Sequence, residues 1–187
     1  SGEVFHAPLI EFNPNLELSV VLERTKNKAV VRYPNVKTVR TFEEILEDES
    51  IELVVVNTPN QLHYPMAKAA LEAGKHLVVE KPFTLNSKQG EELIGLAKSK
   101  NLVLSVFYNK RFEGDFFTIQ DMIRKNTLGK IYYFEAHFDR YKPEIGVKKW
   151  KEENIEGAGI LWDLGPHLID QALLLFGSPL EIKSDSN

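Results

Sequence analysis

The chain has 187 residues, of which 43% are hydrophobic and 27% charged, and its formal net charge is -4. This composition excludes a disordered or fibrous protein, and the absence of a basic cluster argues against a nucleic-acid partner. With no Cys, disulfides, thiolate metal sites and cysteine nucleophiles are excluded as well. The apolar runs are too short to span a bilayer, so we expect a soluble, cytoplasmic protein with no membrane partner.

Apolar runs of strand length alternate along the chain with stretches of helical period. The runs cover residues 16–22, 51–56, 76–79 and 102–107. Their high content of Val, Leu and Ile is typical of strands that are buried on both faces of a parallel sheet. The alternation predicts an α/β fold in which helices connect the parallel strands.

Three helices are predicted between these strands. Apolar residues recur at helical spacing over 62–73, and Gly74 follows where a C-terminal cap belongs. Thr41 and Glu44 form the pattern of a capping box at the start of a shorter helix. A third helix is expected to begin near Asn86.

After residue 108 the pattern changes, and we place a domain boundary there, between residues 1–108 and 109–187. A helix is expected over 112–123, followed by a strand over 131–140 whose strict alternation indicates a sheet with one buried face. The first residues resemble the inside of a helix-opening loop, and residues 180–183 resemble a strand without partners. We therefore expect both ends to be truncated.

The residues that follow each strand are candidates for ligand contacts, because doubly wound sheets bind ligands at the carboxyl ends of their strands. Glu23 and Arg24 follow the first run. An acidic residue there can hold a ribose, and an Arg can receive a 2'-phosphate or stack on adenine. Two solvated charges in a turn would explain the same pair equally well.

The turn at 57–60, which follows the second run, leads into a helix whose free N–H groups favour an anion. His63 lies one turn into that helix, where a surface or capping role is the commoner explanation. Glu80, Lys81 and Pro82 follow the third run. Lys81 there could donate to a substrate oxygen or move a proton, although a Glu-Lys surface pair before a turn is the alternative.

Asp163, His167 and Asp170 share one helical face near the end of the chain. Because Pro166 is tolerated only near a helix start, we expect this trio close to a helix N-terminus. A carboxylate beside an imidazole can tune it as a general acid or base, and a capping Asp with a core His is the alternative. No His pair at ligand spacing is present, so no metal site is expected.

Several motifs together resemble the Gfo/Idh/MocA oxidoreductases, the glucose-fructose oxidoreductase and inositol dehydrogenase family. The motifs are residues 57–63, residues 73–82, and Asp163 with His167 and Asp170. Residues 107–112 and 137–143 are similar to its NADP-linked scyllo-inositol dehydrogenase-like members. The resemblance covers essentially the whole chain.

The resemblance implies a Rossmann-like domain followed by part of an α+β domain whose open, largely antiparallel sheet serves substrate binding and subunit contact. The catalytic residues implied are Lys81, Asp163 and His167: His167 exchanges the proton of the substrate hydroxyl, Lys81 polarises that oxygen, and Asp163 positions substrate or His167. The cofactor residues implied are Gly2, Glu23, Arg24, Thr58, Pro59, His63, Glu80, Lys81 and Asn109. Arg140, Tyr141 and Trp162 are proposed as substrate-binding residues, and the Lys81–Pro82 peptide is expected to be cis.

The implied activity is hydride transfer between a secondary alcohol of a polyol, cyclitol or sugar and NADP, with NAD as the other possible cofactor. A homo-oligomer, a dimer or tetramer, is expected through the C-terminal sheet. The alternative is a non-catalytic regulator of the same fold that senses the dinucleotide.

The chain departs from the family pattern in two ways. Of the family's G-x-G-x-x-G loop only Gly2 is present, and most of the C-terminal sheet is missing. We therefore expect activity from a full-length parent protein.

Overall fold

The computed structural model describes residues 2–139, 141, 143–144 and 153–185. The chain divides into two compact units, Ser1–Phe107 and Tyr108–Asn187, each considered by itself. Among the residues that the structure describes, no helix is long and apolar enough to cross a membrane.

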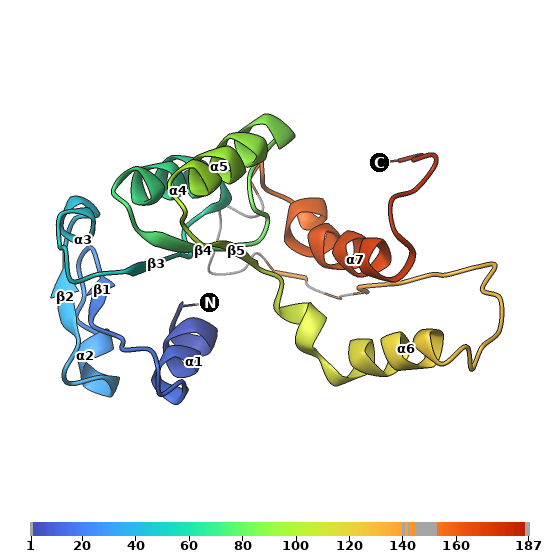
Figure 1. Cartoon of the computed structure of the whole chain (residues 1–187), viewed down its shortest axis with the longest axis horizontal. Coiled ribbons are helices and arrows are strands. Elements are labelled where there is room, and N and C mark those ends of the chain that lie inside the picture. Colours follow the sequence, from blue (N-terminus) through green and yellow to red (C-terminus); the bar gives the residue numbers. More distant parts are fainter. Residues whose placement is uncertain (1, 140, 142, 145–152, 186–187) are drawn as a thin grey trace. The chain divides into compact units, whose positions relative to one another are not determined.

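The first unit alternates strands and helices, as the sequence predicts (Figure 1). Its elements are η1 (Gly2–His6), α1 (Ala7–Phe12), β1 (Val20–Leu22), α2 (Ala29–Arg32), β2 (Lys37–Val39), α3 (Glu43–Leu46), β3 (Leu53–Val56), η2 (Asn60–Leu62), α4 (His63–Glu72), β4 (His76–Glu80), α5 (Ser87–Ser99) and β5 (Leu104–Phe107). The four predicted strands are confirmed as β1, β3, β4 and β5, and β2 is an additional one.

All strand pairs are parallel and fall into two sheets, β1-β2 and β3-β4-β5. In the larger sheet Val56 pairs with Val79, and Glu80 with Phe107. The carboxyl ends of β3, β4 and β5 therefore share one edge. The α/β fold class is confirmed.

The core lies where α4 and α5 pack against the larger sheet, and the two helices run side by side in Figure 1. Leu71 of α4, Leu77 of β4 and Leu93 of α5 are fully buried at its centre. Burying a side chain of this size contributes about 1.5–3 kcal/mol. This core fixes the strand ends on which the candidate site is built.

The expected helix boundaries hold closely at two of the three predicted helices. The Asn86 side chain caps α5 by accepting from the N–H of Gln89, and Gly74 follows α4 with a φ of 78°. Glu44 reaches back to the N–H and hydroxyl of Thr41 at 2.9 Å each, but α3 itself begins only at Glu43.

The second unit contains η3 (Asn109–Phe112), α6 (Gly114–Arg124) and α7 (Ile160–Phe176). The strand expected over 131–140 is wrong for the part described: residues 131–139 form no ladder there. A strand needs a partner for its backbone N–H and C=O groups, and none lies beside it among the described residues. The alternation still places Phe134 against Phe176 of α7, with ring centroids 5.1 Å apart.

The position of Pro166 also differs from the expectation. It is the seventh residue of α7 rather than a residue of the first turn. The helix therefore starts early enough that Asp163 occupies its first turn while His167 and Asp170 lie deeper. Since Pro has no N–H, the carbonyl of Trp162 loses its usual helical donor at this point.

Candidate functional site

The ligand edge of the first unit is formed by the residues that follow β1, β3 and β4. Glu23 follows β1, Thr58 lies two residues beyond β3, and Lys81 follows β4. In a parallel sheet these exits are the usual position of a bound ligand.

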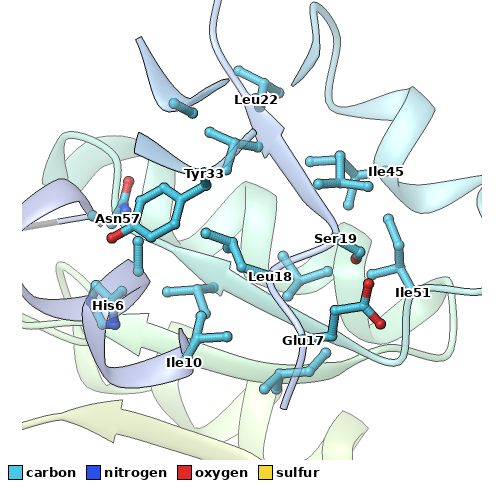
Figure 2. Close-up of a pocket in the computed structure, with 18 of the residues that line it drawn as sticks. His6, Ile10, Glu17, Leu18, Ser19, Leu22, Tyr33, Ile45, Ile51 and Asn57 are labelled. Carbon is cyan, nitrogen blue, oxygen red and sulfur yellow. The ribbon is translucent and has the colours of Figure 1, made fainter. Parts of the chain in front are cut away.

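A cavity of about 1010 Å³ lies between β1 and β3 (Figure 2). Among the described residues β1 pairs with β2 and β3 with β4, so each strand has an unpaired edge facing the cavity. Its body is apolar, with Ile10, Leu18 and Ile51 among the side chains drawn in Figure 2. Three of the predicted cofactor residues, Gly2, Glu23 and Thr58, also line it.

Gly2 and Thr58 differ in what they offer a dinucleotide. A Cβ atom at Gly2 would collide with the side-chain amide of Asn57, so only a glycine at residue 2 lets that side chain approach the backbone so closely. The Thr58 hydroxyl is buried without a hydrogen-bond partner among the described residues. An orphaned hydroxyl beside an exposed backbone turn suits the oxygen atoms of a bound pyrophosphate.

Glu23 is held by the backbone that follows it. Its carboxylate accepts from the N–H of Lys28 at 3.1 Å and of Ala29 at 3.3 Å. Arg40 donates to the carbonyls of Glu23 and Lys26 in the same loop. Arg24 is exposed beside them, as are Lys26 and Lys28 of the same loop, and Arg24 is the cation next to Glu23.

His63 is fully buried, and both of its ring nitrogens face backbone carbonyls. Nδ1 lies 2.7 Å from the oxygen of Pro82, and Nε2 lies 3.0 Å from that of Thr58. Carbonyl oxygens only accept hydrogen bonds. The ring therefore ties together the turns after β3 and β4, and any effect on a cofactor would pass through those turns.

Glu80, the last residue of β4, receives a contact from the N-terminal segment. His6 Nε2 lies 2.9 Å from its Oε1, and both side chains are largely buried, 7% and 13% exposed. The His6 ring also lies 4.2 Å from that of Phe107, the register partner of Glu80 on β5. Lys81 follows at once, half-buried, and the Lys81–Pro82 peptide is cis as expected.

In the second unit, α7 positions the predicted acid-base pair. Asp163 lies in its first turn, where a carboxylate is favoured by the helix dipole, and its N–H bonds to the Gly159 carbonyl at 3.0 Å. His167, one turn on, is 7% exposed, and its ring packs edge to face with that of Phe138, with the ring centroids 6.4 Å apart.

The remaining predicted contacts also fall in this unit. Asn109 opens η3, Trp162 is half-buried in the first turn of α7, and Tyr141 is 92% exposed. Arg140 lies outside the described residues. Lys81 belongs to the first unit and Asp163 with His167 to the second, so each part of the predicted catalytic set is described in its own unit.

Asp170, the third member of the trio, forms a two-pronged ion pair with Arg111 of η3. Its oxygens lie 2.7 Å from Nε and 2.5 Å from a terminal nitrogen of the guanidinium. The hydrogen bond to Asp170 raises the pKa of Arg111. Burial, and then the charge of Asp170, raise the pKa of Tyr108, whose ring lies 5.1 Å from the guanidinium carbon of Arg111. Asp170 therefore anchors η3 to α7.

Sequence reasoning missed His6 and Arg111. His6 lies four residues after Gly2 in the helical segment Gly2–His6. Residues four apart share one face of a helix, so the ring is expected on the same side as Gly2. That spacing is the signal that could have identified it. Arg111 stood within a motif that carried the resemblance, but nothing local connects it with a partner 59 residues away.

Two protein-family models match this chain, one in each half. Residues 1–108 match a family model described as an oxidoreductase family with an NAD-binding Rossmann fold, and residues 116–187 match the GFO/IDH/MocA C-terminal domain.

Similar proteins include the uncharacterized oxidoreductase YdgJ of Escherichia coli, 45% identical over 99% of this chain and 53% of its own length. The scyllo-inositol 2-dehydrogenase (NADP(+)) IolW of Bacillus subtilis is 38% identical over 99% of this chain and 51% of its own. The crystal structure of an oxidoreductase from Bacillus cereus, 31% identical, matches with a TM-score of 0.85 over 96% of this chain and 51% of that one.

This chain thus spans about half the length of the curated relatives it matches. The family model over residues 1–108, described as an NAD-binding Rossmann fold, agrees with the parallel sheets of the first unit, and the two models together cover most of the chain. The chain belongs to the Gfo/Idh/MocA family of oxidoreductases.

Proposed function

We propose that this chain is part of an NAD(P)-dependent dehydrogenase that oxidises a secondary alcohol of a polyol, cyclitol or sugar. The observation that carries the proposal is the presence of Lys81 at a strand exit of an NAD-binding family domain, together with Asp163 and His167 on one helix in the part of the chain that matches the family's C-terminal domain. A relative named as a scyllo-inositol dehydrogenase supports the substrate class.

The chemistry assigned to each side chain follows from its type. His167 takes the hydroxyl proton of the substrate as a general base, since imidazole changes charge near neutral pH. The Lys81 ammonium stabilises the negative charge that develops on the same oxygen. Asp163 orients either the substrate or His167. When bound, the dinucleotide would supply the acceptor for the hydride of the carbinol carbon.

Gly2, Glu23, Arg24, Thr58, Pro59, His63, Glu80, Lys81 and Asn109 are the residues assigned to the dinucleotide. Thr58 would lie closest to its pyrophosphate, because its buried hydroxyl has no hydrogen-bond partner among the described residues, and Gly2 lines the same cavity. Glu80 and His63 would act through their neighbours, since their described contacts are to His6 and to backbone carbonyls.

NADP is the proposed cofactor. The Glu23 carboxylate already accepts hydrogen bonds from two backbone N–H groups, whereas Arg24 is exposed at the same strand end and can bind a 2'-phosphate. Calorimetry on the full-length protein should give a lower Kd for NADP than for NAD. Arg24→Ala should raise the Kd for NADP alone, and tighter binding of NAD by the unmodified protein would contradict this choice.

Turnover is tested by following nicotinamide reduction with a panel of inositols, polyols and sugars. Lys81→Ala and His167→Ala should each lower kcat by about 100- to 10,000-fold, the usual range for a positioned acid or base. Lys88→Ala and His137→Ala, which change the same residue types at exposed positions, should leave kcat unchanged. Tight NADP binding without turnover on any of these substrates would identify a nucleotide-sensing protein instead.

A homo-oligomer formed through the C-terminal domain remains a prediction.

Substrate contacts are assigned to Arg140, Tyr141 and Trp162. Trp162→Phe should raise KM more than it lowers kcat if the ring only binds substrate. Equal losses of kcat and kcat/KM would instead place Trp162 among the groups that act in the transition state.

A further inference from the structure

Two buried histidines hold the residues on either side of Lys81. Glu80, just before the lysine, accepts from His6 at 2.9 Å, and Pro82, just after it, accepts from His63 at 2.7 Å. His6 is 6% exposed and His63 is fully buried. The backbone that carries Lys81 is thus fixed from both sides by ring N–H donors.

The donor direction is set by the partners. A carboxylate and a carbonyl oxygen can only accept, so His6 donates from Nε2 to Glu80. Both ring nitrogens of His63 face carbonyl oxygens, and we assign the donated hydrogen bond to the shorter contact, from Nδ1 to Pro82 at 2.7 Å. Hydrogen bonds to an ionised group or between buried groups are shorter and harder to replace than exposed ones. Each histidine therefore restricts its neighbour of Lys81 more firmly than a surface contact would.

The two histidines come from the elements assigned to the dinucleotide. His6 ends the helical segment that begins at Gly2, and His63 also contacts the carbonyl of Thr58 through Nε2 at 3.0 Å. A displacement of the Gly2–His6 segment would reach Glu80 through the His6 hydrogen bond, and a displacement of the Thr58 turn would reach Pro82 through the His63 ring. The third contact of this set, between the His6 ring and Phe107, fixes the ring itself.

We infer that His6 and His63 form a two-histidine clamp that positions Lys81 relative to the dinucleotide site. Neither ring is a catalytic residue in this inference, which rests on the proposed role of Lys81. Groups that orient a reacting side chain typically change the rate by about 10- to 100-fold when they are removed, because small misplacements are costly.

The kinetic test uses the full-length protein. His6→Phe keeps an aromatic ring against Phe107 but loses the donor, and should lower kcat by about 10- to 100-fold while leaving the Kd for NADP unchanged. His6→Gln keeps an N–H donor and should restore most of kcat. His76→Gln is the matched control, since His76 begins the same strand at the opposite end from Lys81.

The partner of His6 gives a second kinetic criterion. Glu80→Gln and His6→Phe should be strongly non-additive, because both remove the same contact. His63→Phe, which removes the donor to Pro82, should likewise lower kcat. His63→Gln, which keeps an N–H donor, should restore most of kcat. A loss of thermal stability with unchanged kcat in His6→Phe and His63→Phe would mean that the rings only support the fold, and would overturn the clamp.

A measurement without turnover separates this inference from the proposed function. Reductive methylation with ¹³C-labelled formaldehyde gives each lysine an NMR signal, and Lys81→Arg identifies the signal of Lys81. That signal should move in His6→Phe and His63→Phe but not in His76→Gln. An unmoved signal would overturn the clamp even in an active enzyme, whereas a moved signal in a protein that turns over no alcohol would leave the clamp standing and refute the dehydrogenase proposal.

Discussion

The two units differ in how far they bury their apolar side chains. In residues 1–107 the sheet β3-β4-β5 and its helices bury a continuous cluster that includes Leu71, Leu77 and Leu93 at zero exposure. In the described part of residues 108–187, Phe116 is the one buried apolar side chain, and much of α7 is exposed, with Leu173 at 44% and Phe176 at 46%. A parallel sheet with helices on it completes its own core, whereas a single apolar helix does not.

The contrast extends to polar contacts. In the first unit, buried histidines join strand ends that a core already holds. In the second, the ion pair between Arg111 and Asp170 joins η3 to α7 where few apolar contacts do so. We therefore expect the stability of the first unit to depend on packing, and that of the second to depend more on individual polar pairs.

The largest effect is expected from truncating the core of the first unit. Leu77→Ala should lower its free energy of unfolding by about 2–5 kcal/mol, through lost burial and the cavity left behind. Leu173→Ala, on the exposed side of the comparison, should cost less than about 1 kcal/mol. Hydrogen exchange of β4 amides measures the first unit, and fluorescence of the two Trp residues, both at positions above 107, measures the second. Similar losses for both variants would remove the contrast.

Breaking the ion pair should have the next largest effect, confined to the second unit. Asp170→Asn leaves the guanidinium of Arg111 without its charged partner, and we expect a loss of about 1–3 kcal/mol, since the carboxylate is only 12% exposed. Asp121→Asn is the control: it removes a carboxylate that pairs with Arg124 and Lys125 on the exposed surface of α6, and exposed pairs contribute about 0–1 kcal/mol. Urea unfolding followed by Trp fluorescence distinguishes the two, and equal losses would contradict the special role of Asp170.

Tyr108 gives a pH-dependent view of the same region. Because burial and then Asp170 raise its pKa, the neutral phenol is favoured in the folded state. Its contribution to stability is complete below the unfolded pKa, near 10, and is lost as the pH rises through the folded pKa. The difference in tyrosinate absorbance between the unmodified protein and Tyr108→Phe reports this titration. In Asp170→Asn the pKa of Tyr108 should fall, and an unchanged titration would show that Asp170 does not act on it.

The same contrast explains what the sequence could predict. Strands β1, β3, β4 and β5 and the helices between them follow from local period, because each buries its own apolar face in a shared core. Strand β2 escaped notice because its residues, Lys37–Val39, include no apolar run, and its pairing with β1 rather than its composition defines it. The strand expected over 131–140 failed for the converse reason: its alternation is clear, but the described residues supply no partner.

Candidate site residues divide in the same way. Lys81 and the face shared by Asp163 and His167 could be identified, since a strand exit or a helical spacing marks them. The contacts that hold these groups could not, because His6 meets Glu80 across 74 residues of sequence and Arg111 meets Asp170 across 59. Such pairs depend on how the elements pack, for which a single sequence carries no local pattern.

The smallest effect is expected at the rim of the first unit, outside its core. Hydrogen bonds from the N–H of Arg40, then from the N–H and hydroxyl of Thr41, lower the pKa of Glu44. A lowered pKa means that this contribution to stability is present above the unfolded value, about 4.3, and is lost as the pH falls through the folded pKa. Glu44→Gln should therefore remove the loss of amide protection around α3 that the unmodified protein shows as the pH falls. Glu43→Gln, the same change on the neighbouring exposed residue, should leave that pH dependence of protection unchanged. If Glu44→Gln instead altered exchange in β4, the rim and the core of this unit would be one cooperative structure, and the contrast between packing and polar pairs would not hold within the first unit.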